Sequence, residues 1–305
     1  RYNRRLVLEA IRHNPNISRI KLSRTTGLSG QTISNIVNEL IRDGMVSEQG
    51  AVPVTNGPGR PRRSLFLNPN GRYAIGIHID PIYNTVVLLN LEGRILDKEH
   101  PSLPEKAVDA MPVLAESVHR LLARNNVLED RNGGVGIAVP GPLDGERGAK
   151  MINPPNLPGW YGTDIAGEMS KMLNMPVSVS KDVTSACYGE LWSTPDRSDR
   201  AFLFFYLGTG TAAGLGWYGQ VLRGRTDNAG EIGHIVVDSN GPQCPICGMR
   251  GCLSLTCDPR SIINEACSLG LIPESNSGDS DYSVQTKYLD LIERSKQGDQ
   301  ACRDL

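Results

Sequence analysis

The sequence places three cysteines and one histidine where they could share a single metal ion. Cys244, Cys247 and Cys252 have the spacing C-x2-C-x4-C, and His234 lies ten residues before the first of them. Three thiolates and one imidazole complete the tetrahedral shell of a structural zinc and leave no position open for water. The alternative is a group of buried free thiols, because the seven cysteines of the chain are an odd number that does not suit a disulfide framework. The tight spacing favours bound Zn²⁺.

A second chemical signal lies near the N-terminus, where residues 30–43 have the pattern of an amphipathic helix. Its apolar side chains recur at helical spacing: Ile33, Ile36, Val37, Leu40 and Ile41. Its opposite face carries small and amide side chains that can hydrogen-bond base edges in a major groove: Gln31, Thr32, Ser34, Asn35 and Asn38. This pattern is typical of a DNA recognition helix.

Further elements are predicted around that helix. An apolar face at residues 6–11 and a stretch from Arg19 to Thr26 give two more helices, and Ser18 and Ser29 can act as N-caps. After Gly44, residues 45–47 and 64–67 can pair as the strands of a wing. The loop between them carries three arginines placed to reach phosphates or a narrow minor groove: Arg60, Arg62 and Arg63. Residues 1–67 are therefore predicted to form a winged helix-turn-helix domain.

The charge distribution supports a nucleic-acid partner for this segment. Residues 1–66 hold eleven Lys and Arg side chains against four acids, whereas the rest of the chain holds 21 against 29, and the total is close to neutral at −1. From the helices alone, a small structural bundle followed by a solvated linker is an equal alternative. A basic segment attached to an acidic body favours double-stranded DNA instead.

The rest of the chain has an α/β pattern. Apolar β-type runs near 73–79, 85–91, 133–140, 176–180 and 201–208 alternate with helical stretches near 106–125, 161–173 and 183–191, after a hairpin turn at Glu92-Gly93. No apolar run approaches the roughly 20 residues that span a bilayer, and the start of the chain lacks an export signal. A cytoplasmic protein of two or more units, with no membrane partner, is expected.

The order of several motifs in this chain resembles the ROK family (repressors, open reading frames and sugar kinases). The winged helix is followed by GRP at 59–61, VPGP at 139–142, PNLPGW at 155–160, LGTGTAAG at 207–214, NAGEIGH at 228–234 and GCL at 251–253. The resemblance implies a two-lobed sugar-kinase/actin-like (ribonuclease H-like) body over residues 68–305, with lobe 1 at about 68–182 and lobe 2, with the zinc site, at about 183–305. The long form resembles the family's repressors of sugar metabolism. The resemblance to the family also implies sugar-binding positions at Asn156, Asp182, Glu231 and His234.

The same resemblance exposes a departure from the kinases of the family. Those kinases carry a D-x-G-x-T phosphate loop after the first strand, where this chain has IHIDPIYNT with Pro81, Ile82 and Tyr83. Bulky residues there are expected to block the nucleotide, so neither ATP binding nor enzymatic activity is predicted. Asp182 matches the catalytic base position, although an Asp there could equally cap the helix beginning near Val183. Gly208 to Gly210 match the second phosphate loop, which is weak evidence alone.

Other departures concern the sugar pocket. Lys181 stands where relatives usually have Asn and Ser254 where they have Glu, so two sugar contacts are altered. Lys181 could pair with Asp182 and close the site, or could favour a phosphorylated or acidic sugar. His234 could give one nitrogen to zinc and the other to sugar. The C-x-x-C spacing, where many relatives have C-x-C, is still compatible with zinc.

Three hypotheses follow from these residues. The first is a sugar-responsive repressor without kinase activity that binds an operator, with a sugar or sugar phosphate as effector and a homodimer or higher oligomer as the working form. The second is an ATP-dependent sugar kinase with a DNA-binding module, and the third is a ligand-independent regulator with a vestigial pocket. The chain is also expected to be incomplete at its C-terminus, because Leu305 follows a helical pattern through Tyr288 and Ile292 without a stop signal.

Overall fold

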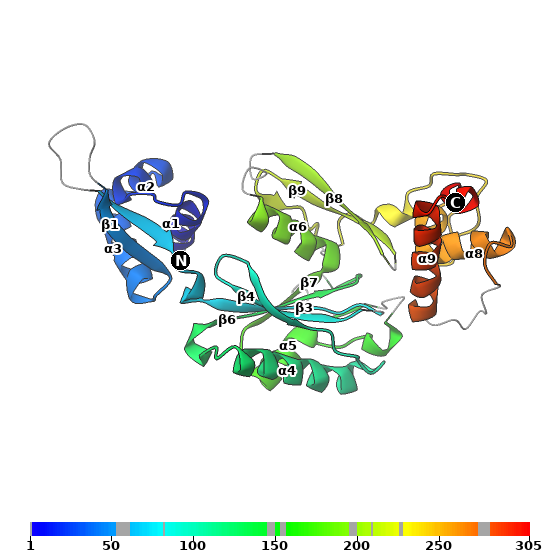
Figure 1. Cartoon of the computed structure of the whole chain (residues 1–305), viewed down its shortest axis with the longest axis horizontal. Helices are drawn as coiled ribbons and strands as arrows, with labels where there is room; N and C mark the ends of the chain where they lie inside the picture. The colour runs from blue at the N-terminus through cyan, green and yellow to red at the C-terminus, as the bar shows by residue number, and fades with distance from the viewer. Residues whose placement is uncertain are drawn as a thin grey trace.

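The N-terminal segment of this computed structural model is a winged helix (Figure 1). The structure describes residues 2–52, 62–81, 83–144, 150–152, 157–194, 200–208, 210–225, 228–273 and 281–305. Helices α1 (Tyr2–His13), α2 (Arg19–Thr26) and α3 (Gly30–Arg42) precede the antiparallel strands β1 (Val46–Val52) and β2 (Arg62–Leu67). The Ser18 and Ser29 hydroxyls accept the N–H groups of Lys21 and Thr32. Both predicted caps are confirmed.

One core joins these helices to the wing. The apolar faces of the helices meet residues of both strands in a single buried cluster: Val7, Ile11, Ile17, Leu22, Ile33, Val37, Leu40, Val46 and Leu65. Pairing of Val46 with Leu67 sets the register of the wing. The segment therefore buries its apolar side chains internally, as an independently packed unit does.

The next unit is a five-stranded sheet covered on one face by helices. Strands β3 (Tyr73–His78), β4 (Thr85–Asn90), β5 (Ile95–Glu99), β6 (Asn132–Val139) and β7 (Val177–Lys181) lie in the order β5-β4-β3-β6-β7. β3, β6 and β7 are parallel, whereas β4 and β5 are antiparallel to their neighbours. Helices α4 (Ala107–Arg124) and α5 (Ile165–Leu173) pack below the sheet in Figure 1. The predicted hairpin at Glu92-Gly93 is confirmed, because it joins β4 to β5.

Helix α6 (Asp182–Ser193) leads from β7 to a second sheet. Strands β8 (Ala201–Leu207), β9 (Thr211–Trp217) and β10 (Gln220–Val221) are antiparallel in the order β10-β9-β8. A glycine at position 214 of β9 is required here, because an added Cβ would lie 2.4 Å from the Cys187 Sγ and 2.6 Å from the Val183 carbonyl oxygen of α6. This close packing fixes α6 on the second sheet.

The chain then turns through short elements to a helical end. These elements are η5 (Ile232–His234), α7 (Ser254–Cys257), α8 (Pro259–Ser268), α9 (Asp281–Lys296) and α10 (Gln300–Arg303). Earlier single turns are η1 (Pro69–Gly71), η2 (Glu129–Arg131) and η3 (Pro158–Trp160). The helical pattern through Tyr288 and Ile292 is α9, which ends at Lys296, and Gly298, with φ +104°, separates it from α10. A positive φ stops an α-helix, and glycine adopts it without strain.

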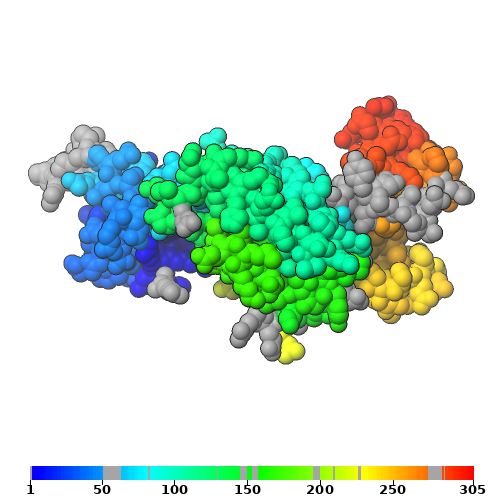
Figure 2. Space-filling model, turned by 90° about the horizontal axis from the view of Figure 1, so that it is seen from below, coloured from blue at the N-terminus to red at the C-terminus, as the bar shows by residue number. Residues whose placement is uncertain are grey.

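Seen from below, the two helices of the five-stranded unit form the middle of the molecule (Figure 2). The winged helix lies at one end of it, and the segment from η5 to α10 lies at the other. Among the residues that the structure describes, no helix combines the length and the apolar character needed to cross a bilayer.

Candidate DNA interface, sugar pocket and metal centre

The outer face of α3 presents amide side chains to solvent. Gln31 and Asn35 are exposed one helical turn apart, and the Gln31 Nε2 donates to the Asn35 Oδ1 at 3.1 Å. Asn38 is also exposed, but its Oδ1 accepts from the Arg19 Nη2 at 3.0 Å. Gln31 and Asn35 are therefore the two predicted base readers whose amides bond to each other rather than to another element among the residues that the structure describes.

Thr32 and Ser34 are placed differently from these amides. Both are half-buried, and the Ser34 hydroxyl donates to the Gly30 carbonyl at 2.9 Å, while the Thr32 hydroxyl lies 2.9 Å from the Ser29 hydroxyl. Hydroxyls bound in this way are engaged locally, by the helix backbone and by its N-cap, rather than directed at a base. Their prediction as base contacts stays a prediction, with a local structural role alongside it.

Arg19 is not among the residues that the sequence pattern predicts at this interface, yet it joins its parts. Its guanidinium binds Glu48 of the wing at 3.0 Å and Asn38 of α3 at 3.0 Å. Arg63 is 67% exposed and also reaches Glu48, at 3.5 Å. The basic residue after the Ser18 cap was the available signal, but only the fold shows that it faces the wing.

The other two predicted arginines are less defined. Arg62 is the first residue of β2, and its side chain lies outside what the structure describes, as does the whole of Arg60.

The four predicted metal ligands lie together in space. One ligand atom from each of His234, Cys244, Cys247 and Cys252 falls within 4.8 Å of all the others. The Cys247 and Cys252 Sγ atoms are 3.4 Å apart, and the Cys244 Sγ is 3.7 Å from the His234 Nδ1. Zn–S bonds of about 2.3 Å at tetrahedral angles separate two sulfurs by roughly 3.8 Å. The cluster is therefore compatible with zinc.

The local backbone and the electrostatics suit a cation. Burial alone would raise the pKa of the Cys244 thiol, but N–H groups of Cys247 and Ile246 directed at its sulfur lower that pKa to about 7. Burial and the neighbouring sulfurs raise the pKa of Cys252 to about 12. Thiolates packed this closely repel each other unless a metal ion neutralises them. The loop requires a glycine at position 251. Gly251 has φ +66°, and an added Cβ would lie 1.5 Å from the Asp238 carbonyl oxygen.

The proposed sugar pocket contains an unexpected ion pair. Lys181 at the end of β7 is buried, and its ammonium contacts the Glu231 carboxylate. Lys181 therefore pairs with Glu231, another predicted sugar contact, while its charge still acts on the neighbouring Asp182. The stem of Lys181 lies along the VPGP loop, because an added Cβ on Gly141 would be 3.2 Å from its Cε. Asn156 lies outside the described residues.

Asp182 is placed as the first residue of α6, and Lys181 occupies the N-cap position. The N-cap therefore lies one residue before the Asp182 considered from the sequence. The Asp182 Oδ1 still accepts the Val183 N–H at 2.7 Å. Burial raises the pKa of Asp182, and the Val183 N–H, Lys181 and His78 only partly oppose that effect. Its carboxylate is a poorly solvated acceptor of the kind that binds sugar hydroxyls.

Ser254 supports the backbone of this pocket. Its hydroxyl donates to the Gly233 carbonyl at 2.9 Å, next to His234. The serine that replaces the usual glutamate therefore holds the turn that carries His234.

The segment in place of the first phosphate loop is closed on itself. The buried Asp80 accepts the Tyr83 N–H at 3.3 Å, and the Asp80 N–H donates to the Asn84 Oδ1 at 3.1 Å. Pro81 has no N–H to offer. Phosphate loops bind by converging backbone N–H groups, and the Asp80 and Tyr83 N–H groups are already engaged. Tyr83 does not fill the loop: it is 55% exposed, with its ring centroid 4.6 Å from that of His100. Ile82 lies outside the described residues.

Tyr206 is a further residue that the sequence pattern did not indicate. An added Cβ on Gly208 would be 2.3 Å from the Tyr206 hydroxyl, so the phenol lies against the second Gly-rich turn. Burial raises the pKa of Tyr206, and the charges of Asp80 and Asp182 add to the shift. The sequence signal that could have identified Tyr206 is its phenol hydroxyl in an otherwise apolar strand, two residues before that turn. The phenol therefore lies against the Gly-rich turn, where the charges of both carboxylates act on it.

The class of this protein is defined by a winged helix joined to a two-sheet, sugar-kinase-like body. The winged helix-turn-helix DNA-binding model matches residues 1–47, and the ROK family model matches residues 74–305. This chain belongs to the ROK family.

Known proteins similar to this chain include both regulators and a kinase. It is 30% identical over 262 residues to the xylose repressor of Bacillus spizizenii, which covers 86% of this chain and 67% of that protein. A crystal structure of a ROK family transcriptional regulator, a homologue of the Escherichia coli Mlc protein, matches 92% of this chain and 72% of its own at 25% identity and a TM-score of 0.73. The glucokinase of Thermotoga maritima is 32% identical over 193 residues, 62% of this chain and 58% of that enzyme.

Proposed function

We propose that this chain is a sugar-responsive DNA-binding transcriptional repressor of carbohydrate metabolism that does not transfer phosphate. The closed turn at Asp80 carries the proposal, because it occurs in the same chain as an exposed amide-bearing recognition helix. The similarity to a xylose repressor supports the regulatory role. A repressor acts where its operator is, so a cytoplasmic location follows.

The proposal gives each part of the body a role. Residues 68–182 and 183–305 form two lobes that hold a neutral or phosphorylated sugar between them, with Asn156, Asp182, Glu231 and His234 as its contacts. His234 binds zinc through Nδ1, the nitrogen nearest Cys244, and offers Nε2 to the sugar. Zinc, when bound, supplies a structural crosslink rather than chemistry. The ion pair of Lys181 with Glu231 is the interaction that a sugar hydroxyl would compete with.

Release of DNA follows from a difference in affinity between two conformers. A homodimer presents two winged helices (residues 1–67) to half-sites roughly 34 Å apart. A sugar weakens operator binding only insofar as it prefers the conformer in which the two recognition helices are wrongly spaced.

Two substitutions separate base reading from phosphate binding. Removal of the exposed Asn35 amide by Asn35→Ala is expected to cost about 1–3 kcal/mol on the preferred duplex, a loss of about 5- to 150-fold, and to relax the base preference. Arg63→Ala should weaken binding to every duplex and lower the salt slope by about 0.9. Fluorescence anisotropy on duplexes selected from a random pool measures both effects, and Arg60→Ala is expected to behave as Arg63→Ala does.

Lys296→Ala, which removes an exposed charge at the end of α9, is the matched control and should change neither quantity. Unaltered operator affinity in both Asn35→Ala and Arg63→Ala would show that this face does not bind DNA.

A thermal-shift panel separates the proposal from its two rivals. Zinc-loaded protein is heated with D-xylose, D-glucose or N-acetyl-D-glucosamine, each free and as a monophosphate, with and without ATP and Mg²⁺. A ligand that binds only the folded state raises the Tm, and the rise grows with the ratio of ligand concentration to Kd. A shift with one sugar and none with ATP is expected. An ATP shift with turnover that Asp182→Asn abolishes would instead support the kinase, which the similarity to a glucokinase makes the second candidate. No shift with any sugar would favour a vestigial pocket.

A further inference from the structure

One helix of the body extends from the proposed sugar pocket to the winged helix. Helix α6 begins at Asp182 and has Trp192 in its last turn. Its 12 residues span about 18 Å at the usual rise. A helix of this length transmits a displacement at one end to the other without internal bending.

At its far end, α6 contacts the first helix of the DNA-binding domain. The Arg12 guanidinium carbon lies 3.8 Å from the centroid of the Trp192 ring, and the Arg12 Nη1 donates to the Trp192 carbonyl oxygen at 2.5 Å. The Arg12 Nε is buried and has no hydrogen-bond partner among the described residues. The Nε that has lost water in this way depends on the aromatic face for its stabilisation.

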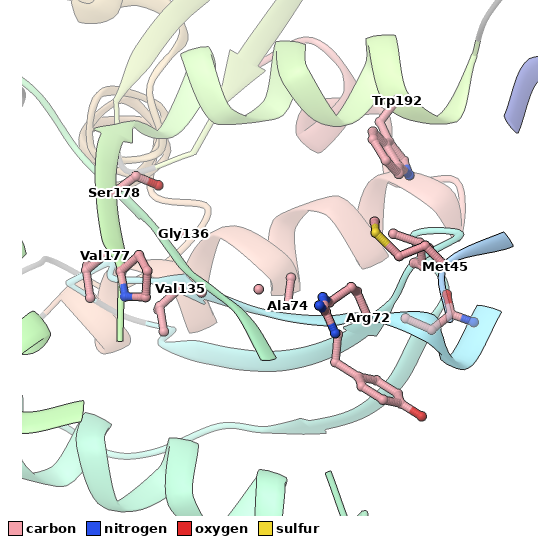
Figure 3. A pocket seen from close by; sticks show the side chains of 14 residues that line it. Met45, Arg72, Ala74, Val135, Gly136, Val177, Ser178 and Trp192 are labelled. Atoms are coloured by element: carbon pink, nitrogen blue, oxygen red, sulfur yellow. The ribbon is translucent and has the colours of Figure 1, made fainter. Parts of the chain in front are cut away.

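Trp192 is also fixed to the five-stranded sheet. Its indole Nε1 donates to the Glu92 carbonyl at 3.1 Å, in the turn between β4 and β5. Gly93 in this turn has φ +85°, and an added Cβ there would be 2.3 Å from the Trp192 Nε1. Figure 3 shows Trp192 projecting from α6 towards Met45, across a cavity of about 580 Å³. The indole, which α6 carries, therefore contacts both the winged helix and the first sheet.

The contacts of Trp192 with Arg12 and Glu92 form a joint between the winged helix and the body. The surroundings of this joint are open rather than tightly packed. A second cavity of about 470 Å³ lies between α1, α2 and the end of α6, and Arg12, Tyr188, Trp192 and Tyr218 are among its lining. Since protein interiors resist deformation through close packing, an interface with cavities on both sides has room to reorient.

The pocket end of α6 is held by the second sheet. Val183 and Cys187 pack on Gly214 of β9, and Lys181, one residue before the helix, pairs with Glu231 of the sugar pocket. A sugar that competes for Glu231 or contacts Asp182 acts on the first turn of α6. A shift of the second sheet against the first would then move Trp192 relative to Glu92 and Arg12.

We infer that Arg12 and Trp192 are positioning residues that make the orientation of the winged helix depend on α6, and so transmit sugar binding at Asp182 to the operator. This inference rests on the function proposed above and names the structural route of its regulation. Neither residue belongs to the DNA face or to the sugar pocket, so their loss should uncouple two binding events that each survive.

The first experiment examines the joint without sugar or DNA. Backbone ¹⁵N relaxation of the full chain gives the rotational correlation times of the winged helix and of the body, for wild type, Trp192→Ala, Arg12→Met, Trp192→Phe and Arg12→Lys. Equal times are expected in the wild type, and a shorter time for the winged helix in Trp192→Ala and Arg12→Met. The conservative Trp192→Phe and Arg12→Lys should largely restore the wild-type value. Independent tumbling in the wild type would overturn the inference.

The second experiment measures coupling with the sugars of the thermal-shift panel as probes. Operator Kd is measured with and without saturating sugar, and sugar Kd by calorimetry without DNA. In the wild type the ratio of the two operator Kd values is expected to fall in the usual range of about 5 to 150. Trp192→Ala and Arg12→Met should reduce it to below about 2 while keeping sugar affinity within about 3-fold, a change that loss of stability alone does not produce.

Leu289→Ala is the control, because Leu289 is an exposed apolar side chain on α9, outside this joint, and its loss should leave the ratio unchanged. A wild-type ratio in Trp192→Ala that still binds sugar would overturn the inference and leave the proposed function standing. A wild type that ignores every sugar of the panel would overturn the proposed function, and the transmission with it.

Discussion

Replacing Cys247 with Ser is expected to lower bound zinc from about one equivalent per chain to a small fraction and to make the body melt early. Cys247 is exposed, so the substitution removes a ligand without opening a cavity in the core. Structural zinc contributes apparent free energies of about 10–16 kcal/mol in small peptides. If only about 3 kcal/mol of this stabilises the body, the Tm falls by roughly 6–12 °C. Elemental analysis and circular-dichroism melting of protein purified without chelator measure both.

Cys267→Ser is the matched control for this prediction. Cys267 is half-buried in α8, and its sulfur lies 3.2 Å from the Pro273 carbonyl, a contact that a serine hydroxyl can replace. It should retain zinc and Tm. Wild-type protein that contains no stoichiometric metal, or a Cys247→Ser protein that melts with the wild type, would contradict the zinc site.

Asp182→Asn is expected to weaken sugar binding by about 10- to 150-fold, the equivalent of about 1.5–3 kcal/mol for a hydrogen bond to a charged group. The amide keeps the shape of the side chain and can still accept the Val183 N–H, so the helix start should persist. Isothermal calorimetry with the sugar that raises the Tm measures the loss. Undiminished affinity would exclude Asp182 from the pocket.

The same substitution has a pH signature. Burial raises the pKa of Asp182 above its ordinary 3.8, so the ionised carboxylate destabilises the folded state at higher pH. This loss is absent below pH 3.8, grows as the pH rises to the raised pKa and is complete above it. Asp182→Asn should therefore melt at or above the wild-type Tm at pH 8, and its advantage should shrink as the pH falls. Asp258→Asn, at the N-cap of α8, should show neither effect, because Asn is also a good cap.

The winged helix could be predicted closely from the sequence because its signals are local. The bounds of α2 and α3 follow from Ser18, Ser29 and the recurrence of apolar residues, and helix capping acts within one turn. The turn at Glu92-Gly93 and the metal cluster were predictable for a similar reason: their spacing along the chain restricts their spacing in space.

Interactions between distant residues could not be obtained in this way. Arg19 meets Glu48 over 29 positions and Lys181 meets Glu231 over 50, while Arg12 and Trp192 are 180 apart. A charged side chain can reach several partners of opposite sign, and only the packing of elements selects one. For that reason the sequence left two roles open for Lys181, a pairing with Asp182 or the recognition of a phosphorylated or acidic sugar, and only the fold shows its contact with Glu231.

The phosphate loop shows the division most clearly. The replacement of its glycines by Pro81, Ile82 and Tyr83 predicts, from sequence, a loop that does not bind nucleotide, because backbone approach to phosphate requires small residues. The physical reason came from the tertiary structure, where Asp80 and Asn84 engage the loop amides and Tyr83 turns out towards His100. Residue types decided which chemistry was open to this protein, because they limit the donors and charges present. The fold decided which donors are already engaged, because this depends on neighbours that only folding brings together.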